Sequence, residues 1–489
     1  DLARVLRAIM PLTTWEQPPD LAGQLTLRSK LASQAGRISL DGNGQIEQFV
    51  AGRSESAIRE PRVEFVSRAA IDTQKQRVDI EQLKLTSRLL GLEARGAIED
   101  YTGARRLDLQ CSYSTEWQPV MALIHQLAPA TAGSITINGR TSDTFTVRGP
   151  LNTPDAEPAW RGVQTQVGVQ WDSARFYGLN VSGIQLRPHL HDALLEIPDA
   201  SAAASGGRIN VGGAIDLAPA DPVLLMKGER RVLDGIPINA QLSRDVLSHL
   251  NPIFAETSEI QGNVSVVLRD VRLPLGADKR SSRGSGVFTA SQIRLQPRGI
   301  LAELVKLGSV AQSRFGSGLA EVRMSDLHFR MDNGRISYDD FTMLFVDGQL
   351  DLKFRGYIEM GGDMNLIVSV PVRAGLLEQF GVKGEITQYV RLAEGMRVDI
   401  PVRGTRQAPR LDMASVNMKP ILDNLLKQTI SSGARDAVGR ILGAPADRNS
   451  GAAPRPQAAP RPEEAVRDIV DGLLAPRQKQ NQQGRSRSR

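Results

Sequence analysis

The stretch of sequence that decides the fold reads QLDLKFRGYIEMGGDMNLIVSV and spans residues 349–370. Its apolar side chains return at every second position, in two runs. The runs consist of Leu350, Leu352 and Phe354, followed by Met364, Leu366, Val368 and Val370. Intervening residues such as Asp351, Lys353 and Asn365 are polar. Because successive side chains of a strand point to opposite faces, this alternation predicts two strands with one apolar face and one solvent-exposed face.

The same alternation continues on both sides of this stretch, over residues 284–412. It includes Leu327, Phe329 and Met331 upstream, and Val398, Ile400 and Val402 downstream. The segments Asp332-Asn333-Gly334 and Asp347-Gly348 lie between such runs and have the composition of hairpin turns. The region is therefore predicted to be a meander of antiparallel strands. Looser versions of the same pattern occupy the chain upstream of it.

The overall composition narrows the class of protein. A chain of 489 residues exceeds one ordinary core, so we expect roughly two to four structural units. A single cysteine, Cys111, excludes an internal disulfide framework and a multi-cysteine metal site. The net charge of +6 is modest and comes largely from arginines near the C-terminus, so nucleic-acid binding is not predicted. No run approaches the ~20 apolar residues that a membrane-spanning helix needs.

A short helix, a proline, a glycine and a strand recur in the same order along the chain. Four residues match four others at a constant offset of 123 residues: Leu127, Pro129, Ile137 and Gly139 match Leu250, Pro252, Ile260 and Gly262. A looser copy surrounds Pro11. We therefore predict stacked units of about 120 residues, each with one short helix and a set of strands. The predicted units are residues 1–116, 117–239 and 240–412.

The pattern changes after Leu411. Apolar residues spaced by 3.6 predict amphipathic helices within residues 413–443. Residues 444–489 are rich in proline, alanine and arginine and are predicted to be disordered, apart from a short helix near 463–474. Another amphipathic helix, at 299–310, is expected to cover one end of the last unit. The chain begins at Asp1 within a helical pattern, and we expect it to be part of a longer protein.

Residues that could support catalysis or metal binding are sparse. His189 and His191 lie on one predicted strand face, with Asp192 and Glu196 nearby, but no third histidine or cysteine accompanies them. We therefore predict no metal site there. The sequence contains no G-x-S-x-G, phosphate-loop or H-E-x-x-H motif, and its carboxylates are not paired by spacing. The prediction is a protein without enzymatic activity and without a cofactor.

A sheet of this length with one apolar face leaves that face in water unless other groups cover it. Each Å² of apolar surface removed from water stabilises by roughly 25 cal/mol. The predicted helices are too few to cover it. Two sheets could close on one another as sandwiches, or one long sheet could curl around an apolar trough that holds apolar ligands. The alternation by itself favours the sandwich.

An ordered set of features runs through residues 284–412. It comprises Gly284-Ser285-Gly286, a strand through Phe288 and Ile293, the helix around Leu301 to Leu307, the turn Asp332-Asn333-Gly334, the strand through Leu350 and Leu352, and a closing segment. The closing segment reads VDIPVRGTRQAPRL, residues 398–411, and is the most specific of these features. In this order the features resemble the C-terminal region of the AsmA-like family of bacterial envelope proteins. Residues 83–100 are similar to upstream strands of the same family.

This resemblance implies a long, curled antiparallel sheet that forms an apolar groove. Its members are implicated in phospholipid passage to the outer membrane and in envelope integrity. The resemblance also implies a periplasmic protein, attached to the inner membrane by an N-terminal helix that lies outside this chain. It provides no catalytic residue. We therefore expect a mostly β, groove-forming and repeat-like protein, with short helices between strand sets and helices at the C-terminal end.

The residues expected to line the lipid groove share the apolar face of the last unit. They are Leu327, Phe329, Leu350, Leu352, Phe354, Met364, Leu366, Val368, Val370, Val398, Ile400 and Val402. The expected ligands are phospholipid acyl chains, and other envelope proteins are candidate partners. The alternative is a structural periplasmic scaffold of packed sandwiches that binds protein partners through edge strands.

Overall fold

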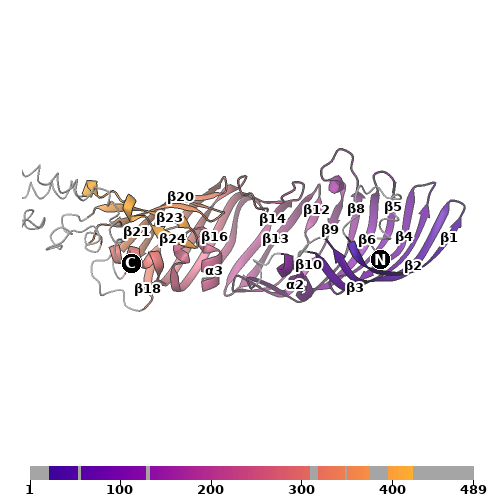
Figure 1. Cartoon of the computed structure of the whole chain (residues 1–489), viewed down its shortest axis with the longest axis horizontal. Helices are drawn as coiled ribbons and strands as arrows, with labels where there is room; N and C mark the ends of the chain where they lie inside the picture. Colours follow the sequence, from indigo (N-terminus) through magenta and orange to yellow (C-terminus); the bar gives the residue numbers. More distant parts are fainter. Residues whose placement is uncertain are drawn as a thin grey trace, which may run out of the picture.

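The computed structural model describes residues 21–52, 57–127, 133–308, 318–346, 350–373, 376 and 395–421. These residues form one continuous sheet of 24 strands in which every pairing is antiparallel. The strands run across the long axis of the molecule, with the N-terminal strands at one end and the C-terminal strands at the other (Figure 1). The prediction of a mostly β protein built on a long antiparallel sheet is confirmed.

The N-terminal part contains seven long strands in a row, with one helix inserted. Its elements are β1 Leu21–Gln34, β2 Arg37–Ala51, β3 Ile58–Asp72, β4 Arg77–Thr86, β5 Gly91–Glu99, β6 Arg106–Glu116, α2 Trp117–Leu127, β7 Ile135–Asn138 and β8 Arg140–Pro150. Each of β1 to β5 pairs with the next strand in sequence, and β6 pairs with β8 along its whole length. Ala35 and Gly36 both have positive φ, 50° and 83°, as the two-residue turn between β1 and β2 requires.

The middle part contains one 3₁₀ helix and seven strands. Its elements are the 3₁₀ helix η3 Ala159–Gly162 and the strands β9 Gln164–Gln166, β10 Val169–Phe176, β11 Leu179–Leu186, β12 His189–His191, β13 Leu194–Ala204, β14 Gly207–Asp216 and β15 Val223–Pro237. The pairings divide into two rows here. One row runs β7–β10–β11–β13, and the other runs β8–β9–β12–β13. The rows rejoin at β13, after which β14 and β15 follow in order.

The C-terminal part contains the remaining strands and most of the helical residues. Its helices are α3 Ala240–Asp245, η4 Leu247–His249, η5 Pro252–Phe254, α4 Gly299–Gly308 and η6 Met413–Ser415. Its strands are β16 Thr257–Pro274, β17 Arg283–Pro297, β18 Ala320–Met324, β19 Leu327–Asp332, β20 Arg335–Phe345, β21 Leu350–Glu359, β22 Met364–Pro371, β23 Arg397–Thr405 and β24 Ala408–Leu411. α4 packs against β17, β22 and β24, because one of its faces is almost wholly apolar and buried.

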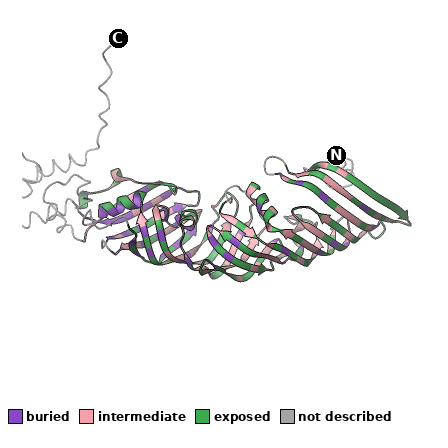
Figure 2. Cartoon of the chain, turned by 90° about the horizontal axis from the view of Figure 1, so that it is seen from below, coloured by how far each residue is buried: buried purple, intermediate pink, exposed green. Residues whose placement is uncertain are grey.

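The hydrophobic core lies in the C-terminal part. One contiguous cluster of buried residues extends from Ala174 to Ile421 and includes the apolar face of α4. In Figure 2 buried residues are concentrated there, whereas intermediate and exposed residues alternate along the N-terminal strands. The sheet is therefore closed around a core at its C-terminal end and forms a single layer over much of its N-terminal part.

The segments expected to repeat at an offset of 123 share several local features. A helix comes before the strand in both, α2 before β7 and β8, and α3 before β16. Gly139 and Gly262 both have positive φ, 111° and 131°, and their carbonyl oxygens accept hydrogen bonds from the Trp117 and Ile238 amides at 3.0 and 2.9 Å. The helices differ, because α2 has eleven residues whereas Pro252 begins a separate 3₁₀ turn after the six residues of α3. The repeat remains a prediction.

Several expected elements lie outside the described residues. These are the helix before Pro11, the turn at Asp347-Gly348, the helices after residue 421, and the tail at 444–489. The helix expected at 299–310 is described as α4, over Gly299–Gly308. The turn expected at Asp332-Asn333-Gly334 joins β19 to β20, with φ values of 50° at Asn333 and 75° at Gly334.

Candidate apolar binding surface

The twelve residues expected to line a lipid groove are all buried in the C-terminal core. The most exposed of them is Met364, at 6%, and Leu327, Leu350, Leu352, Val368, Val370 and Ile400 have no exposed surface. They alternate with residues of the other face, which are mostly polar, as the period of two predicts. The face that they share is closed in this structure by the curled sheet and α4. Their contact with lipid remains a prediction.

An apolar face that remains open lies upstream, on the N-terminal strands. Residues directly opposite one another in an antiparallel pair point to the same face, so the strand register defines rows that run along the sheet. One row joins Leu27, Gly44, Phe65, Leu85, Leu92 and Tyr113. A second joins Ile38, Ile71, Val78, Ile98 and Leu107. A third joins Leu31, Leu40, Ala69, Ile80, Gly96, Leu109 and Val147.

We call this surface the uncovered apolar face. Its large side chains are Leu25, Leu27, Leu31, Ile38, Leu40, Ile46, Phe65, Ile71, Val78, Ile80, Leu83, Leu85, Leu92, Ile98, Leu107, Leu109, Phe145 and Val147. Leu27, Leu31 and Leu83 are exposed to 51%, 69% and 38%, and the others are half-buried. Among the described elements, the principal contacts of β1 to β5 are with their neighbours in the sheet, so no second layer packs on this face.

The dimensions of the uncovered apolar face suit an acyl chain. The longest row crosses seven strands, and strands in a sheet are about 4.8 Å apart, so the face is about 29 Å long. The acyl chains of one leaflet span about half of a hydrocarbon core that is roughly 30 Å thick. A chain lying along the rows would therefore meet aliphatic side chains over its full length.

A glycine at position 44 leaves room on this face for a neighbouring aromatic ring. Gly44 lies between Leu27 and Phe65 in its row, and the Phe65 ring lies over it. A Cβ at Gly44 would lie 2.6 Å from the Phe65 ring and 2.5 Å from the Thr26 carbonyl oxygen. The ring therefore occupies the space that a side chain at position 44 would take, and no side chain rises between neighbouring rows there.

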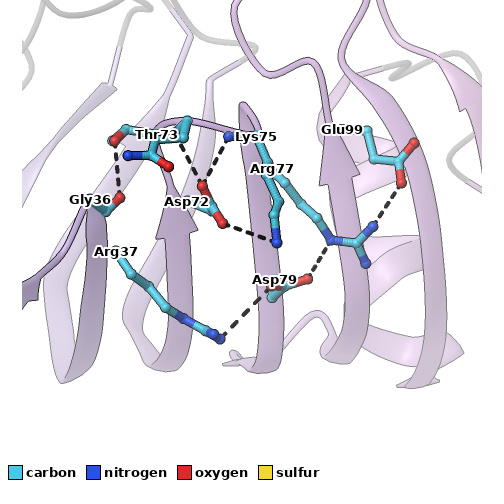
Figure 3. Close-up of polar contacts among 9 residues, drawn as sticks. Gly36, Arg37, Asp72, Thr73, Lys75, Arg77, Asp79 and Glu99 are labelled. Atoms are coloured by element: carbon cyan, nitrogen blue, oxygen red, sulfur yellow. Dashed lines mark hydrogen bonds and ion pairs between the residues drawn. The ribbon is translucent and has the colours of Figure 1, made fainter.

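The opposite face of the same strands is charged. Arg77 pairs with Asp79 and with Glu99, both at 2.7 Å, and Arg37 lies 4.0 Å from Asp79 (Figure 3). Lys84 on β4 pairs with Glu93 on β5 at 2.6 Å. Exposed ion pairs of this kind add little stability, but their charged groups keep this face hydrated. The N-terminal sheet is therefore amphipathic across its thickness.

The charged face also carries a depression of about 590 Å³. Its lining includes the charged and amide side chains of Arg68, Glu81, Glu93, Arg95 and Gln110. These groups are hydrogen-bonded or solvated, as in the pair of hydrogen bonds from Arg95 to Gln110 at 2.6 and 2.9 Å. Covering them with hydrocarbon would remove that hydration at a cost, so the depression does not suit an apolar ligand.

One helix, α2, borders the uncovered apolar face at one long edge of the sheet. α2 and α3 both lie on the same edge of the sheet in Figure 1. Within α2, Met121 is buried, and the Gln126 Nε2 group donates to the Ala57 carbonyl oxygen at 3.2 Å. The Trp117 indole N–H donates to the Gln170 carbonyl oxygen at 2.7 Å, which ties the start of α2 to β10. α2 therefore spans strand ends from β3 to β10.

A polar cluster interrupts the apolar rows where the pairing of the sheet divides. The Tyr113 hydroxyl donates to the Gly168 carbonyl oxygen at 2.5 Å and lies 2.9 Å from the Thr141 hydroxyl. The Gly168 amide donates to Asp143 Oδ2 at 2.6 Å, and Arg187 pairs with the other oxygen of Asp143 at 2.9 Å. Sequence reasoning missed this cluster. The sequence signal for this cluster is that Asp143 and Tyr113 occupy positions where the alternation predicts apolar side chains.

The isolated histidines have structural contacts. His125 on α2 lies 2.9 Å from the Ile135 carbonyl oxygen. His249 on η4 lies 2.6 Å from an Arg406 guanidinium nitrogen. Burial, reinforced by the positive charge of Arg406, lowers the pKa of His249. The neutral imidazole therefore accepts the hydrogen bond from Arg406.

Comparison with protein-family models, with curated proteins and with solved structures found no match. Within the described residues, no helix has the length and apolarity needed to cross a membrane.

Proposed function

We propose that the uncovered apolar face binds phospholipid acyl chains while the headgroups remain in water. We further propose that the protein passes these lipids between the inner and outer membranes of a bacterial envelope without bond chemistry. The observation that carries the proposal is the set of largely apolar rows, the longest of which crosses seven strands, over which the described residues place no covering layer. The periplasmic location and the inner-membrane anchor belong to the proposal through the AsmA-like resemblance.

Physical chemistry supports binding at this face. Burying a leucine or isoleucine side chain stabilises by roughly 1.5–3 kcal/mol, so a face with many such side chains has a large driving force to acquire a cover. A hydrocarbon chain supplies that cover without leaving a polar group unpaired. Along the described strands the rows lie on an open face of the sheet, whose length does not select one chain length. The face therefore suits a class of acyl chains and permits a chain to slide along it.

The direct test is to extract the purified full chain with organic solvent and to identify the extract by mass spectrometry. We expect phospholipid to co-purify in a fixed ratio to protein. The double variant Leu85→Asp/Leu92→Asp places two charges at directly paired positions of the uncovered apolar face and should lose most of this lipid. Lys84→Gln, on the charged face of the same strand, should retain it. Absence of lipid from the wild type, or equal amounts in all three proteins, would contradict the proposal.

A structural scaffold is the second candidate, because β1 leaves a free edge. Within the described residues, this fourteen-residue strand pairs with β2 on one side and with no strand on the other. A row of unpaired backbone groups can bind an extended segment of a partner protein. A wild-type protein that carries no extractable lipid would favour this function.

A further inference from the structure

The hairpin formed by β12 and β13 brings together three side chains that can bind a metal. His189 and His191 lie two residues apart on β12, so both point to one face of the sheet. His189 pairs directly with Glu196 on β13, which places Glu196 on that same face. One ligand atom of each residue can be chosen so that all three lie within 4.8 Å of one another. The sequence alone predicts no metal site at these residues, because the pairing of His189 with Glu196 depends on the strand register.

We propose that His189, His191 and Glu196 form a binding site for a divalent transition metal, with Zn²⁺ as the best fit. Two imidazoles and one carboxylate are a ligand set that zinc accepts, and a water can supply the fourth position. The Asp192 carboxylate lies beside the other ring nitrogen of His191, where it can orient that ring. Imidazole also favours Cu²⁺ and Ni²⁺, whereas Ca²⁺ and Mg²⁺ prefer oxygen ligands throughout.

The observed contacts agree with a shared centre. His191 Nε2 lies 3.4 Å from Glu196 Oε1, and His191 Nδ1 lies 3.5 Å from Asp192 Oδ2. The ring centroids of His189 and His191 are 5.0 Å apart. A tetrahedral ion with bonds of about 2.0–2.1 Å needs its ligand atoms somewhat closer together than 4.8 Å. His189 and Glu196 are exposed, so small side-chain rotations can supply this movement.

The turn of the hairpin fixes these residues in place. Asp192 and Ala193 both have positive φ, 49° and 60°, in a two-residue turn that pairs His191 with Leu194. Glycine and asparagine are the usual residues in such a turn, so an alanine there marks a backbone held by its surroundings. The Leu217 amide contributes by donating to the Ala193 carbonyl oxygen at 2.8 Å. The register that aligns the three ligands is therefore preformed.

A metal at this position would reinforce a thin part of the sheet. β12 has three residues and pairs with β9 through two of them, in the row that bypasses β10 and β11. An ion held by β12 and β13 would join the two strands through their side chains as well as their backbones. Because a ligand that binds the folded state stabilises it, Zn²⁺ should also raise the unfolding temperature.

The test uses the untagged full chain, stripped of metal and titrated with Zn²⁺ in a calorimeter. We expect one saturable site. His191→Ala and Glu196→Gln should each weaken binding by more than about tenfold, the loss that follows even when an outer-shell partner of a metal site is removed. His328→Ala is the matched control, because His328 is an exposed histidine on strand β19 with no second histidine beside it, and this variant should bind as the wild type does.

Two further readouts make the outcome decisive. Co²⁺ in the same site should give the intense visible absorption of a four-coordinate ion, and hydrogen exchange of β12 and β13 should slow when Zn²⁺ is added. Circular dichroism checks that each variant is folded. The proposal is overturned if the wild type shows no saturable binding, or if a folded His191→Ala protein binds Zn²⁺ as tightly as the wild type.

Discussion

At the scale of the residue, the alternation of side chains identifies the two faces of the sheet. It does not show whether an apolar face is open to solvent or closed by packing. Leu366 and Leu85 obey the same alternation and are indistinguishable in sequence pattern. Leu366 is 1% exposed within the C-terminal core, whereas Leu85 is half-buried on the uncovered apolar face. The difference arises because α4 and the curled sheet close one region and no described layer packs on the other. Such long-range packing is not encoded in local alternation.

An aspartate at each of these two leucines should therefore have unequal effects on stability. Leu366→Asp buries a charge without a partner, and we expect it to cost more than about 4 kcal/mol or to unfold the C-terminal part. Leu85→Asp leaves its carboxylate near water, and we expect a loss of about 1 kcal/mol. Urea denaturation followed by far-UV circular dichroism measures both.

The informative result is a larger loss of stability for Leu366→Asp than for Leu85→Asp. Asn365→Asp, one residue from Leu366 on the other face, is the control for charge alone and should leave the urea midpoint near that of the wild type. Equal losses for Leu366→Asp and Leu85→Asp would mean that both leucines are buried to a similar degree.

At the scale of the element, the sequence predicts strands and turns better than it predicts contacts between distant segments. The helix expected at 299–310 is described over Gly299–Gly308, and the turn at Asp332-Asn333-Gly334 occurs, because helix periodicity and turn chemistry are local. The contact between Arg406 and His249 could not be predicted from sequence. Arg406 lies in the turn between β23 and β24, and His249 lies 157 residues earlier on η4. The curled sheet brings them together.

This contact predicts a pH dependence of stability. Because folding lowers the pKa of His249, the unfolded chain binds a proton more readily than the folded chain does. The stabilisation is complete above the ordinary histidine pKa of about 6.5 and declines as the pH falls below it. Thermal unfolding between pH 7.5 and 5 should show this decline in the wild type.

His249→Gln should remove part of that decline, because a glutamine oxygen accepts from Arg406 without titrating. The same substitution at the exposed His328 should leave the wild-type profile unchanged. A His249→Gln protein whose stability falls with acid as steeply as that of the wild type would show that another group controls the dependence.

At the scale of the whole molecule, the fold class was predictable and the position of the open surface was not. Alternation over hundreds of residues predicts one-sided sheet. The choice between packed sandwiches and one curled sheet came from the family resemblance, and the structure has one continuous sheet. The residues expected to line a groove lie in its closed end, whereas the uncovered apolar face lies in β1 to β8. In sequence, those strands show only a looser version of the alternation found in residues 284–412.

The most direct test of acyl-chain binding at the uncovered apolar face places a photo-activated cross-linking amino acid at single positions of the full chain in living cells. At Leu85, on the uncovered apolar face, we expect a covalent lipid adduct, detected by mass spectrometry of the purified protein. At Lys84, on the charged face of the same strand, we expect none, and at Leu366, inside the closed core, we also expect none. A lipid adduct at Lys84 equal to that at Leu85, or no adduct at Leu85, would contradict the claim that this face binds acyl chains.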